Sequence, residues 1–477
     1  MKDIKIFNSL TTKIEDFNPY SIELVAMYCC GITAYDHTHI GHIRKYLGDD
    51  LIKRTIKFNG YNIKHVQNVT DVGHLESDAD EGEDKLEKGA KKHNLTVLEV
   101  ARKFELEFYT VMSEMNITTP DIIERAASDD AISKQIEIIA DLIEKDYAYV
   151  TDTAIYFDTS KLKEYNPFSK QSADEKLQNA RGDVVVDTNK RNKADFVLWV
   201  FKKGDHANHA LEWNTPWGKG FPGWHIECSA IGIKNLGEHI DIHTGGIDHK
   251  EVHHPNEIAQ NEGYLGHSAV KYWVHHNFLT VDGEKMSKSK NNFYTLQTII
   301  EWGYTPMALK YFMYTAHYRK QLNFTQEGLN GASIAYERLL QKVANFDASA
   351  DITQSNIDKY IQEFASVIND DFNMPDALAV LWNTLNADDL NDTEKLMLIS
   401  KYDEVFGLNI LENSNKYCNN ELDCDVLPVD VQNLIEQRKQ ARLNKDYDLS
   451  DKLRAELNAL GYNIEDRADR VVVSKIN

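Results

Sequence analysis

The sequence predicts an α/β protein built on an open parallel sheet. Strand-like and helical segments alternate from Ile4 to about Pro120, which is typical of parallel strands joined by crossover helices. This alternation is interrupted from Asp121 to about Gly204, after which strand-like and helical segments alternate again. We therefore expect an insertion between two halves of one sheet domain. Past Trp302 the amphipathic spacing becomes helical, which predicts a bundle.

The individual elements follow from apolar spacing and from Gly and Pro punctuation. In the first half we expect a strand near Val25, a helix from His42, a strand over 62–68 and a helix over 97–115. The acidic run from Glu76 to Glu87 predicts an exposed loop.

The insertion and the second half are predicted in the same way. The insertion should contain a helix over 131–145 and strands at 154–157 and 195–199. Pro and Gly residues between 213 and 230 predict an irregular loop that leads into a helix at Trp224. The remaining expectations are a strand over 239–243, a helix with Pro255 in its first turn, bundle helices at 309–316, 329–346, 357–367 and 376–385, a linker containing Asn413, Asn415, Asn419 and Asn420, and a last unit from Pro428 to Asn477.

Length and composition narrow the class of protein. A chain of 477 residues is long enough for two to four domains. The N-terminus lacks the apolar core of a signal peptide, and no run of eighteen apolar residues follows, so we expect a cytoplasmic protein without a membrane partner. Five scattered cysteines favour reduced thiols over a disulfide framework. The net charge of −22 argues against non-specific nucleic-acid binding but allows an RNA that is recognised by shape.

The densest chemical motif lies between Tyr28 and Arg44, which reads Y-C-C-G-I-T-A-Y-D-H-T-H-I-G-H-I-R. An apolar run that ends at Gly31 predicts a strand delivering the two cysteines, and His39 and His42 fall at the start of the next helix. A helix N-terminus carries partial positive charge and free N–H groups, so it can hold a phosphate. The alternative is that both histidines are ordinary surface or core residues.

A second motif, K-M-S-K-S, runs from Lys285 to Ser289 in a polar loop after a strand-like segment. Two lysines and two serines can neutralise and hydrogen-bond a triphosphate. Five fixed residues make this a more specific signal than the histidine pair. The alternative is a solvated lysine loop.

Four residues are candidate metal ligands by their chemistry: Cys30, Cys228, His253 and Glu257. A spacing of four lets the last two lie on one side of a helix, and a mixture of Cys, His and carboxylate suits Zn²⁺. The spacing does not choose between these residues and Cys29, His243, His249 or His254. Unrelated buried polar residues are the alternative.

The two signatures together resemble those of class I aminoacyl-tRNA synthetases, and nearly the whole chain resembles the cysteinyl-tRNA synthetase family. The stretches that carry this resemblance are M-Y-C-C-G-I-T-A-Y-D, N-V-T-D, R-N-K-A-D-F-V-L-W, P-G-W-H-I-E-C-S-A, H-H-P-N-E-I-A-Q, K-M-S-K-S, H-Y-R-K-Q-L-N-F and D-D-F-N-M-P. The fold it implies is a Rossmann-like parallel-sheet catalytic domain with an insertion, followed by a helical bundle and a small C-terminal domain. The implied boundaries are 1–120 and 205–276 for the catalytic halves, 121–204 for the connective insertion, 277–325 for the stem-contact region, 326–412 for the bundle and 425–477 for the anticodon-side domain.

The resemblance also implies the site. One zinc ion per subunit would be held by Cys30, Cys228, His253 and Glu257. Catalysis would involve His39, His42, Lys285 and Lys288; ATP, with Mg²⁺, would bind at His39, Gly41, His42, Lys285, Met286, Ser287, Lys288 and Ser289; and the amino acid would meet Thr70, Trp224, His243 and Asp248.

The implied activity is cysteine–tRNA ligation by a monomer. Cysteine would be activated with ATP to cysteinyl-adenylate and pyrophosphate and then transferred to tRNA(Cys). Zinc would distinguish the substrate thiolate from the hydroxyl of serine, because a pocket that senses shape alone discriminates weakly between them. The alternatives are a tRNA-independent cysteine ligase with the same adenylate chemistry and an inactive RNA-binding paralogue.

Several positions depart from the common family pattern. Lys290-Asn291-Asn292 follows the lysine motif, Pro255 replaces a frequent Glu, Val72 to Leu75 replaces an acidic stretch, and Ile247 to Val252 is atypical. These departures concern loop motion and residues around the site more than the ligands themselves.

Overall fold

The computed structural model describes residues 3–75, 82–165, 167–168, 189–286, 292–418, 427–466 and 471–475. Its contacts divide the chain into two compact units. Unit 1 comprises Met1–Ser333, Ile361–Leu381 and Glu404–Gly407, and unit 2 comprises Ile334–Tyr360, Trp382–Asp403 and Leu408–Asn477.

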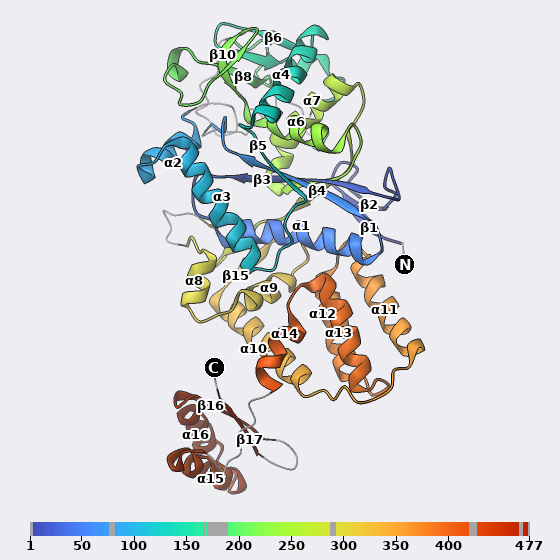
Figure 1. The fold of residues 1–477 in the computed structure, drawn as a ribbon, viewed down its shortest axis with the longest axis vertical. Helices are drawn as coiled ribbons and strands as arrows, with labels where there is room; N and C mark the ends of the chain where they lie inside the picture. Colours follow the sequence, from blue (N-terminus) through green and yellow to red (C-terminus); the bar gives the residue numbers. More distant parts are fainter. Residues whose placement is uncertain are drawn as a thin grey trace. The chain divides into compact units, whose positions relative to one another are not determined.

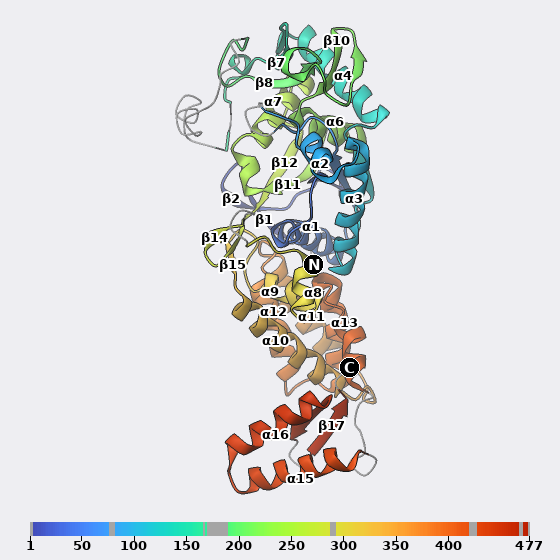
Figure 2. The same ribbon diagram turned by 90° about the vertical axis from the view of Figure 1, so that its left-hand side faces the viewer.

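Unit 1 is organised around a five-stranded parallel sheet in the order β12-β11-β3-β4-β5 (Figure 1). Its strands are β3 (Val25–Thr33), β4 (Ile63–Thr70), β5 (Ile122–Arg125), β11 (Ile240–Gly246) and β12 (Val270–His276). Helix α1 (Ile40–Phe58) lies on one face of the sheet, and α6 (Trp224–Leu236) lies on the other in both views (Figures 1 and 2). This confirms the predicted α/β class with a parallel sheet.

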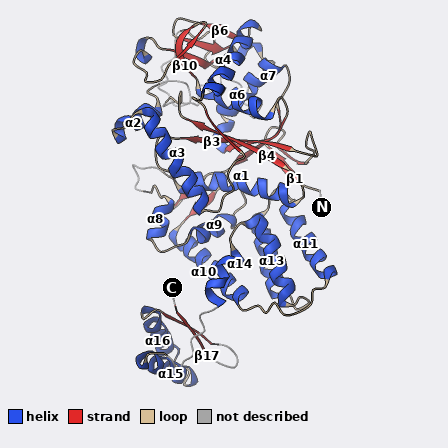
Figure 3. Cartoon of the chain, in the orientation of Figure 1, coloured by secondary structure: helices blue, strands red, loops and turns tan. Residues whose placement is uncertain are grey.

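The segment between β5 and β11 carries a second, antiparallel sheet in the order β6-β7-β8-β10-β9 (Figure 3). Its strands are β6 (Ala148–Val150), β7 (Ala154–Phe157), β8 (Phe196–Phe201), β9 (Trp213–Thr215) and β10 (Gly218–Pro222). The expectation of an irregular loop before Trp224 was wrong for this part, because β9 and β10 form a hairpin across the Pro-Trp turn. The sheet therefore continues past residue 204, where we expected the insertion to end.

The first part of the chain contains further elements, and those at 97–114, 129–144, 253–265 and 306–314 lie where helices were predicted. The further elements are β1 (Lys5–Asn8), β2 (Lys13–Asp16), α2 (Lys85–His93), α3 (Val97–Glu114), α4 (Asp129–Glu144), η1 (Thr159–Lys161), η2 (Gly204–His206), η3 (Ile247–Lys250), α7 (His253–Leu265), β13 (Leu279–Val281), β14 (Glu284–Lys285), α8 (Leu296–Glu301), α9 (Pro306–Tyr314) and β15 (Leu322–Phe324). Within this part of the chain, residues 166 and 169–188 lie outside the described residues.

The helical part of the chain and the last unit complete the fold. The helices are α10 (Gln326–Ala344), α11 (Gln354–Ile368), α12 (Met374–Asn386), α13 (Asp392–Phe406), α14 (Ile410–Cys418), α15 (Val429–Leu443) and α16 (Tyr447–Ala459), and the final strands are β16 (Tyr462–Asp466) and β17 (Val471–Lys475). The prediction of a linker at Asn413 and Asn415 was wrong, because both lie in α14, and Asn419 and Asn420 fall outside the described residues. Among the described residues, no helix combines the length and the apolar character that crossing a bilayer requires.

The prediction of an exposed loop from Glu76 to Glu87 was wrong from Asp84 on, because Asp84 is buried and α2 begins at Lys85. Asp84 is buried: its carboxylate caps α2 through the N–H of Leu86 at 2.7 Å and also accepts the N–H of Gly73 at 2.9 Å. His209, also buried, approaches the same carboxylate at 3.3 Å and stacks on Phe221. This pair therefore joins the first half of the sheet domain to the antiparallel sheet, while residues 76–81 lie outside the description.

The Asp84–His209 pair should make the stability of the protein depend on pH. Burial lowers the pKa of His209, but bonds to Asp84 and to the Leu211 carbonyl outweigh burial and raise it. A raised pKa contributes stability that is complete below the unfolded value of about 6.5 and is lost as pH rises through the folded value. We expect His209→Gln to lower the melting temperature by about 2 °C at pH 6 and by less at pH 8.5.

Melting followed by circular dichroism at one heating rate measures this difference. His267→Gln is the matched control, since His267 faces Glu238 at 3.7 Å but on the exposed surface, where such pairs contribute little. An equal loss at both pH values for His209→Gln would contradict the prediction.

Candidate active site and metal centre

The site lies where the order of the parallel strands reverses. Strands β3 and β11 are neighbours at the middle of the sheet, and the chain proceeds from them in opposite directions, to β4 and to β12. In open α/β sheets this switch point, at the carboxyl ends of the strands, is where ligands bind. Cys30 lies on β3 and His243 on β11, so both are delivered to this position.

A local irregularity of β3 positions Cys30. The pairing of β3 with β4 shifts register between Cys29 and Ile32, and the N–H of Gly31 donates to the side-chain oxygen of Asn68 at 2.7 Å. A Cβ on Gly31 would lie 1.6 Å from the Asn68 carbonyl oxygen, so only glycine allows this approach. Contrary to expectation, the strand does not end at Gly31 but continues to Thr33.

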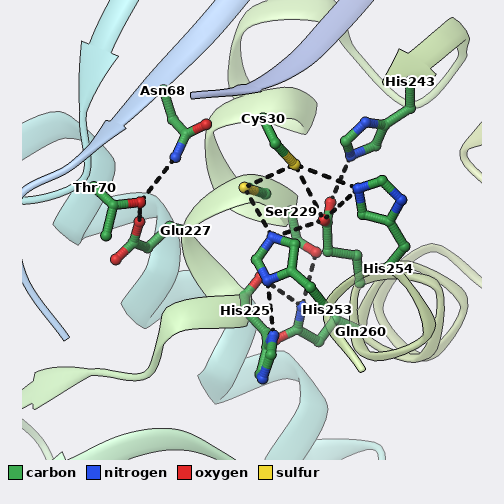
Figure 4. A network of polar contacts seen from close by, with 12 residues as sticks. Cys30, Asn68, Thr70, His225, Glu227, Ser229, His243, His253, His254 and Gln260 are labelled. Carbon is green, nitrogen blue, oxygen red and sulfur yellow. Dashed lines mark hydrogen bonds and ion pairs between the residues drawn. The ribbon is translucent and has the colours of Figure 1, made fainter. Parts of the chain in front are cut away.

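The four predicted metal ligands converge in the core. One ligand atom of each of Cys30, Cys228, His253 and Glu257 lies within 4.8 Å of every other, and all four residues are buried. The Cys30 and Cys228 sulfurs are 3.9 Å apart, and Nε2 of His253 lies 3.4 Å from the Cys228 sulfur and 3.1 Å from Oε1 of Glu257. Strand β3 and helices α6 and α7 thus supply a compact set of soft and hard donors (Figure 4).

A second group overlaps the first. Cys30, His243, His254 and Glu257 also offer ligand atoms within 4.8 Å of one another, with Nε2 of His254 3.4 Å from the Cys30 sulfur. Neither Cys29 nor His249 belongs to a metal-ligand group among the described residues. The geometry therefore separates Cys30 from Cys29, and it brings both His253 and His254 to the cluster.

The charges in the cluster depend on one another. Burial raises the pKa of the Cys228 thiol, but the Cys30 hydrogen bond and His253 outweigh burial and lower it to about 6. Burial lowers the pKa of His253, yet Cys228 and Glu257 raise it to about 10. Burial raises the pKa of Glu257, while His243 and His253 bring it down to about 2. A thiolate and a carboxylate thus share one imidazolium in the dry interior, an arrangement that favours a cation.

Further polar groups hold the imidazoles in place. Nδ1 of His253 lies 2.9 Å from Nδ1 of His225, and Nδ1 of His254 lies 2.8 Å from Nε2 of His275. Gln260 donates to the carbonyl of His225 at 2.9 Å. Partners on the second ring nitrogen are typical of metal-binding histidines because they fix the tautomer and the ring orientation. Sequence reasoning missed these partners, although His225 precedes Cys228 by one helical turn.

The predicted substrate residues surround the cluster. The Thr70 hydroxyl donates to the buried Glu227 at 2.7 Å and accepts from the Asn68 side-chain amide at 3.1 Å (Figure 4). His243 contacts Glu257 through Nε2 at 2.8 Å, and Asp248 is exposed on η3. Thr70 and His243 are therefore held by the polar core, whereas the Asp248 carboxylate is open to solvent.

Trp224 starts helix α6 between two imidazoles. Its ring stacks on His74 with centroids 4.0 Å apart and lies 4.1 Å from the ring of His253. His74 is fixed in turn by the Thr33 hydroxyl at 2.6 Å and by Lys85 at 2.5 Å. Sequence reasoning noted His74 only as a departure from the family pattern, because its partner lies 150 residues away.

The first signature forms the N-terminus of α1. His39 is the N-cap residue, and its Nδ1 accepts the N–H groups of Gly41 and His42 at 3.1 and 3.3 Å. The two imidazoles stack with centroids 3.6 Å apart. Burial lowers the pKa of His42 to about 4, so this ring is neutral at pH 7. Both histidines therefore lie at the helix start, as predicted.

The described part of the second signature reaches the same helix. Lys285 ends β14 and is exposed, and a Cβ on Gly41 would lie 3.2 Å from Cε of Met286. The N–H of Ile40 donates to the Tyr294 carbonyl at 2.9 Å. Ser287, Lys288 and Ser289 lie outside the described residues. The segments that flank them on both sides thus contact the start of α1.

Comparison with known families agrees with this geometry. Residues 16–334 match the family model described as the catalytic domain of class I tRNA synthetases (C), and residues 425–473 match the cysteinyl-tRNA ligase anticodon binding domain. The two matches cover the parallel-sheet region and the C-terminal hairpins.

Three relatives extend the match to the full length of the chain. Cysteine–tRNA ligase 1 of Burkholderia lata is 39% identical over 97% of this chain and 95% of its own. The cysteine–tRNA ligase of Chlorobaculum tepidum is 37% identical over 100% and 99%, and that of Treponema denticola is 35% identical over 99% and 100%.

Solved structures share the fold at low sequence identity. Methionyl-tRNA synthetase of Mycobacterium tuberculosis, in complex with methionyl-adenylate, aligns with a TM-score of 0.53 at 13% identity over 83% of this chain and 91% of its own. LeuRS of Agrobacterium radiobacter K84, in a ternary complex with tRNA and LeuAMS, reaches 0.58 at 11% identity over 85% and 86%. With its full-length relatives and both family domains, this chain belongs to the cysteine–tRNA ligase family of class I aminoacyl-tRNA synthetases, which are ATP-dependent ligases.

Proposed function

We propose that this chain activates cysteine with ATP and transfers it to tRNA(Cys). A carboxylate oxygen of cysteine attacks the α-phosphorus, the bond to the β-phosphate oxygen breaks, and pyrophosphate leaves. The 3′-terminal hydroxyl of the tRNA then attacks the cysteinyl carbonyl, and AMP leaves. The observation that carries the proposal is the buried group of Cys30, Cys228, His253 and Glu257 at the switch point of a class I sheet.

Within this proposal, Cys30, Cys228, His253 and Glu257 hold one Zn²⁺ per subunit. This set is favoured over the one with His243 and His254 because it contains two sulfur donors, which zinc prefers. The negative charges of this ligand set outnumber its positive charges, so the set can accommodate a cation. Zinc, when bound there, would supply the charge that binds the substrate sulfur as a thiolate.

We assign the nucleotide to the two signatures. The set is His39, Gly41, His42, Lys285, Met286, Ser287, Lys288 and Ser289, with Mg²⁺ accompanying ATP. The free N–H groups and partial positive charge of α1 favour the phosphates. Nδ1 of His42 is buried and meets no hydrogen-bond partner among the described residues, so this neutral ring can hydrogen-bond a phosphate oxygen. Lys285 and Lys288 supply the positive charge that the neutral imidazole lacks.

The amino acid is assigned to Thr70, Trp224, His243 and Asp248. The exposed Asp248 carboxylate suits the substrate ammonium, and its charge acts on His42, which indicates that it faces the nucleotide side of the site. Trp224 offers an aromatic wall beside the ligand His253. Phosphoryl transfer needs mainly positioning and charge stabilisation, and these residues can provide both.

The C-terminal residues support tRNA as the acceptor. We further propose that the protein acts as a cytoplasmic monomer. Residues 425–473 match an anticodon binding domain, which favours aminoacylation over a tRNA-independent ligase. An inactive paralogue is disfavoured by the complete ligand cluster and by the histidine signature at the start of α1.

The activity is tested by ATP–pyrophosphate exchange. Purified protein should catalyse exchange with cysteine, whereas kcat/KM with serine should be lower by at least about 10⁴-fold. The reason is that the proposed site binds the substrate through its sulfur atom and does not select it by shape alone. Charging of tRNA(Cys) with radiolabelled cysteine measures the second step. Exchange with another amino acid but not with cysteine would refute the assignment.

The metal assignment is tested by Cys228→Ala. We expect zinc affinity to fall by more than about 100-fold and cysteine-dependent exchange to fall with it, because a direct ligand is lost. Chelator competition measures the first quantity and isotope exchange the second.

Cys29→Ala is the matched control, since Cys29 is the buried neighbour of Cys30 and belongs to no metal-ligand group formed by the described residues. The control should keep both zinc and exchange. Full zinc occupancy in Cys228→Ala would remove Cys228 from the site.

A further inference from the structure

Helix α1 carries a buried charged network that the activation chemistry does not use directly. Nζ of Lys45 donates to the backbone carbonyl of Cys30 at 2.5 Å and to Oδ2 of Asp49 at 2.7 Å. Oδ1 of Asp49 accepts from Nε2 of His276 at 2.8 Å. The side chains are 14%, 2% and 2% exposed for Lys45, Asp49 and His276. Lys45 thus joins α1 to β3 at Cys30, and Asp49 joins α1 to β12 at His276.

The fold is adapted to this network. Lys45 and Asp49 are one helical turn apart on α1, which lets them share a face. Gly48 lies between them, and a Cβ there would be 2.3 Å from Nδ1 of His276. The glycine therefore leaves the space that His276 occupies, at a helix-interior position where glycine is otherwise less favourable than alanine.

Lys45 forms an ion pair next to Cys30. Its Nζ lies 2.7 Å from Oδ2 of Asp49, whose other carboxylate oxygen faces Nε2 of His276 at 2.8 Å. Burial lowers the pKa of His276, so its ring is neutral. Among the described residues, the network is one buried ion pair whose cationic end points at the Cys30 peptide.

This position has a consequence for the metal centre. Cys30 offers its sulfur to both overlapping ligand groups, and its backbone departs from the regular β3 ladder at the adjacent Gly31. An irregular segment lacks part of the ladder hydrogen bonding that fixes a strand, so its orientation depends on other contacts. The bond from Lys45 to the Cys30 carbonyl is such a contact, and it comes from the helix that begins with His39 and His42.

We infer that Lys45, oriented by Asp49 and His276, is a positioning residue. It fixes the position of the Cys30 sulfur for metal and cysteine binding, and it connects Cys30 to α1, the helix whose N-terminus we assign to the nucleotide. The inference rests on the proposed function for its kinetic consequences, but its effect on metal affinity does not require catalysis. If Lys45 only stabilised the fold, its replacement would lower the melting temperature without changing the metal site.

The test compares Lys45→Met with Lys53→Met. Lys53 is the matched control because it is also buried on α1 and also donates to a backbone carbonyl, that of Thr119 at 2.9 Å. Zinc affinity is measured by competition with a chromophoric chelator, and the geometry of the sulfur ligands is measured by the thiolate-to-metal absorption of the Co²⁺-loaded proteins. KM and kcat for cysteine and for ATP come from pyrophosphate exchange.

We expect Lys45→Met to weaken zinc binding by about 10-fold or more, the effect typical of losing a partner outside the direct ligands, and to change the cobalt absorption. KM for cysteine should rise while KM for ATP changes by less than about twofold, since α1 keeps its own N-terminal cap. Lys53→Met should keep the zinc affinity and the cobalt spectrum even where its melting temperature falls.

A second variant keeps the inference testable if Lys45→Met does not fold. Asp49→Asn retains the lysine and the shape of the network but weakens its orientation, so zinc affinity should fall by about threefold to tenfold. In the double variant the two effects should not add, because both act through the same bond. Zinc affinity and cobalt spectra in Lys45→Met and Asp49→Asn that equal those of Lys53→Met would overturn the inference. Absence of cysteine-dependent exchange in the unmutated protein would instead refute the proposed function and leave the metal comparison intact.

Discussion

The structure of unit 1 depends on the burial of ionisable groups at the centre of its sheet. Removing a thiolate, a carboxylate and an imidazolium from water costs several kcal/mol for each group unless they are paired. Cys228, Glu257 and His253 are paired with one another, and Cys228 with Cys30, only when β3, α6 and α7 pack in this arrangement. The relative positions of β3, α6 and α7 are therefore constrained by the same few side chains.

The surrounding histidines follow from this constraint. Burial lowers the pKa values of His225, His254 and His275, and neighbouring imidazoles lower them further, so these rings are neutral. Neutral rings can accept as well as donate, which lets them form the chain of contacts behind the candidate ligands. One positive charge, on His253, is then shared by two anionic neighbours. This leaves a net demand for positive charge at the point where Cys30 and Cys228 converge.

Local sequence signals predicted the helices well because capping and apolar spacing are local properties. The placement of His39 and His42 at the start of α1 is an example, and the spacing from His253 to Glu257 correctly indicated one helical face. Spacing could not choose Cys30 over Cys29, because that choice depends on the register shift of β3 against β4. Side-chain chemistry made Cys228 a candidate ligand, and family resemblance then selected the set of four from the alternatives.

The errors have a similar cause. The hairpin of β9 and β10 was missed because its stability comes from pairing with β8, a strand that apolar spacing alone cannot assign as its partner. The stacking of Trp224 on His74 and the bond from Thr70 to Glu227 also join residues that are far apart in sequence. Propensity contains no information about such contacts, so the residues around the ligands were less predictable than the ligands.

The charge of the C-terminal unit constrains how it could bind RNA. Arg438 is buried and forms two bonds to Asp466, at 2.9 and 2.7 Å, and Arg442 approaches the same carboxylate at 3.2 Å. These guanidinium groups connect α15 to β16 and are less available to phosphates. Between Val431 and Leu460 six basic residues face five acidic ones, so counterion release can supply only a small part of the binding free energy. Recognition of tRNA by these residues would therefore depend on exposed bases and on the shape of the RNA. An acidic chain can recognise both without binding nucleic acid non-specifically.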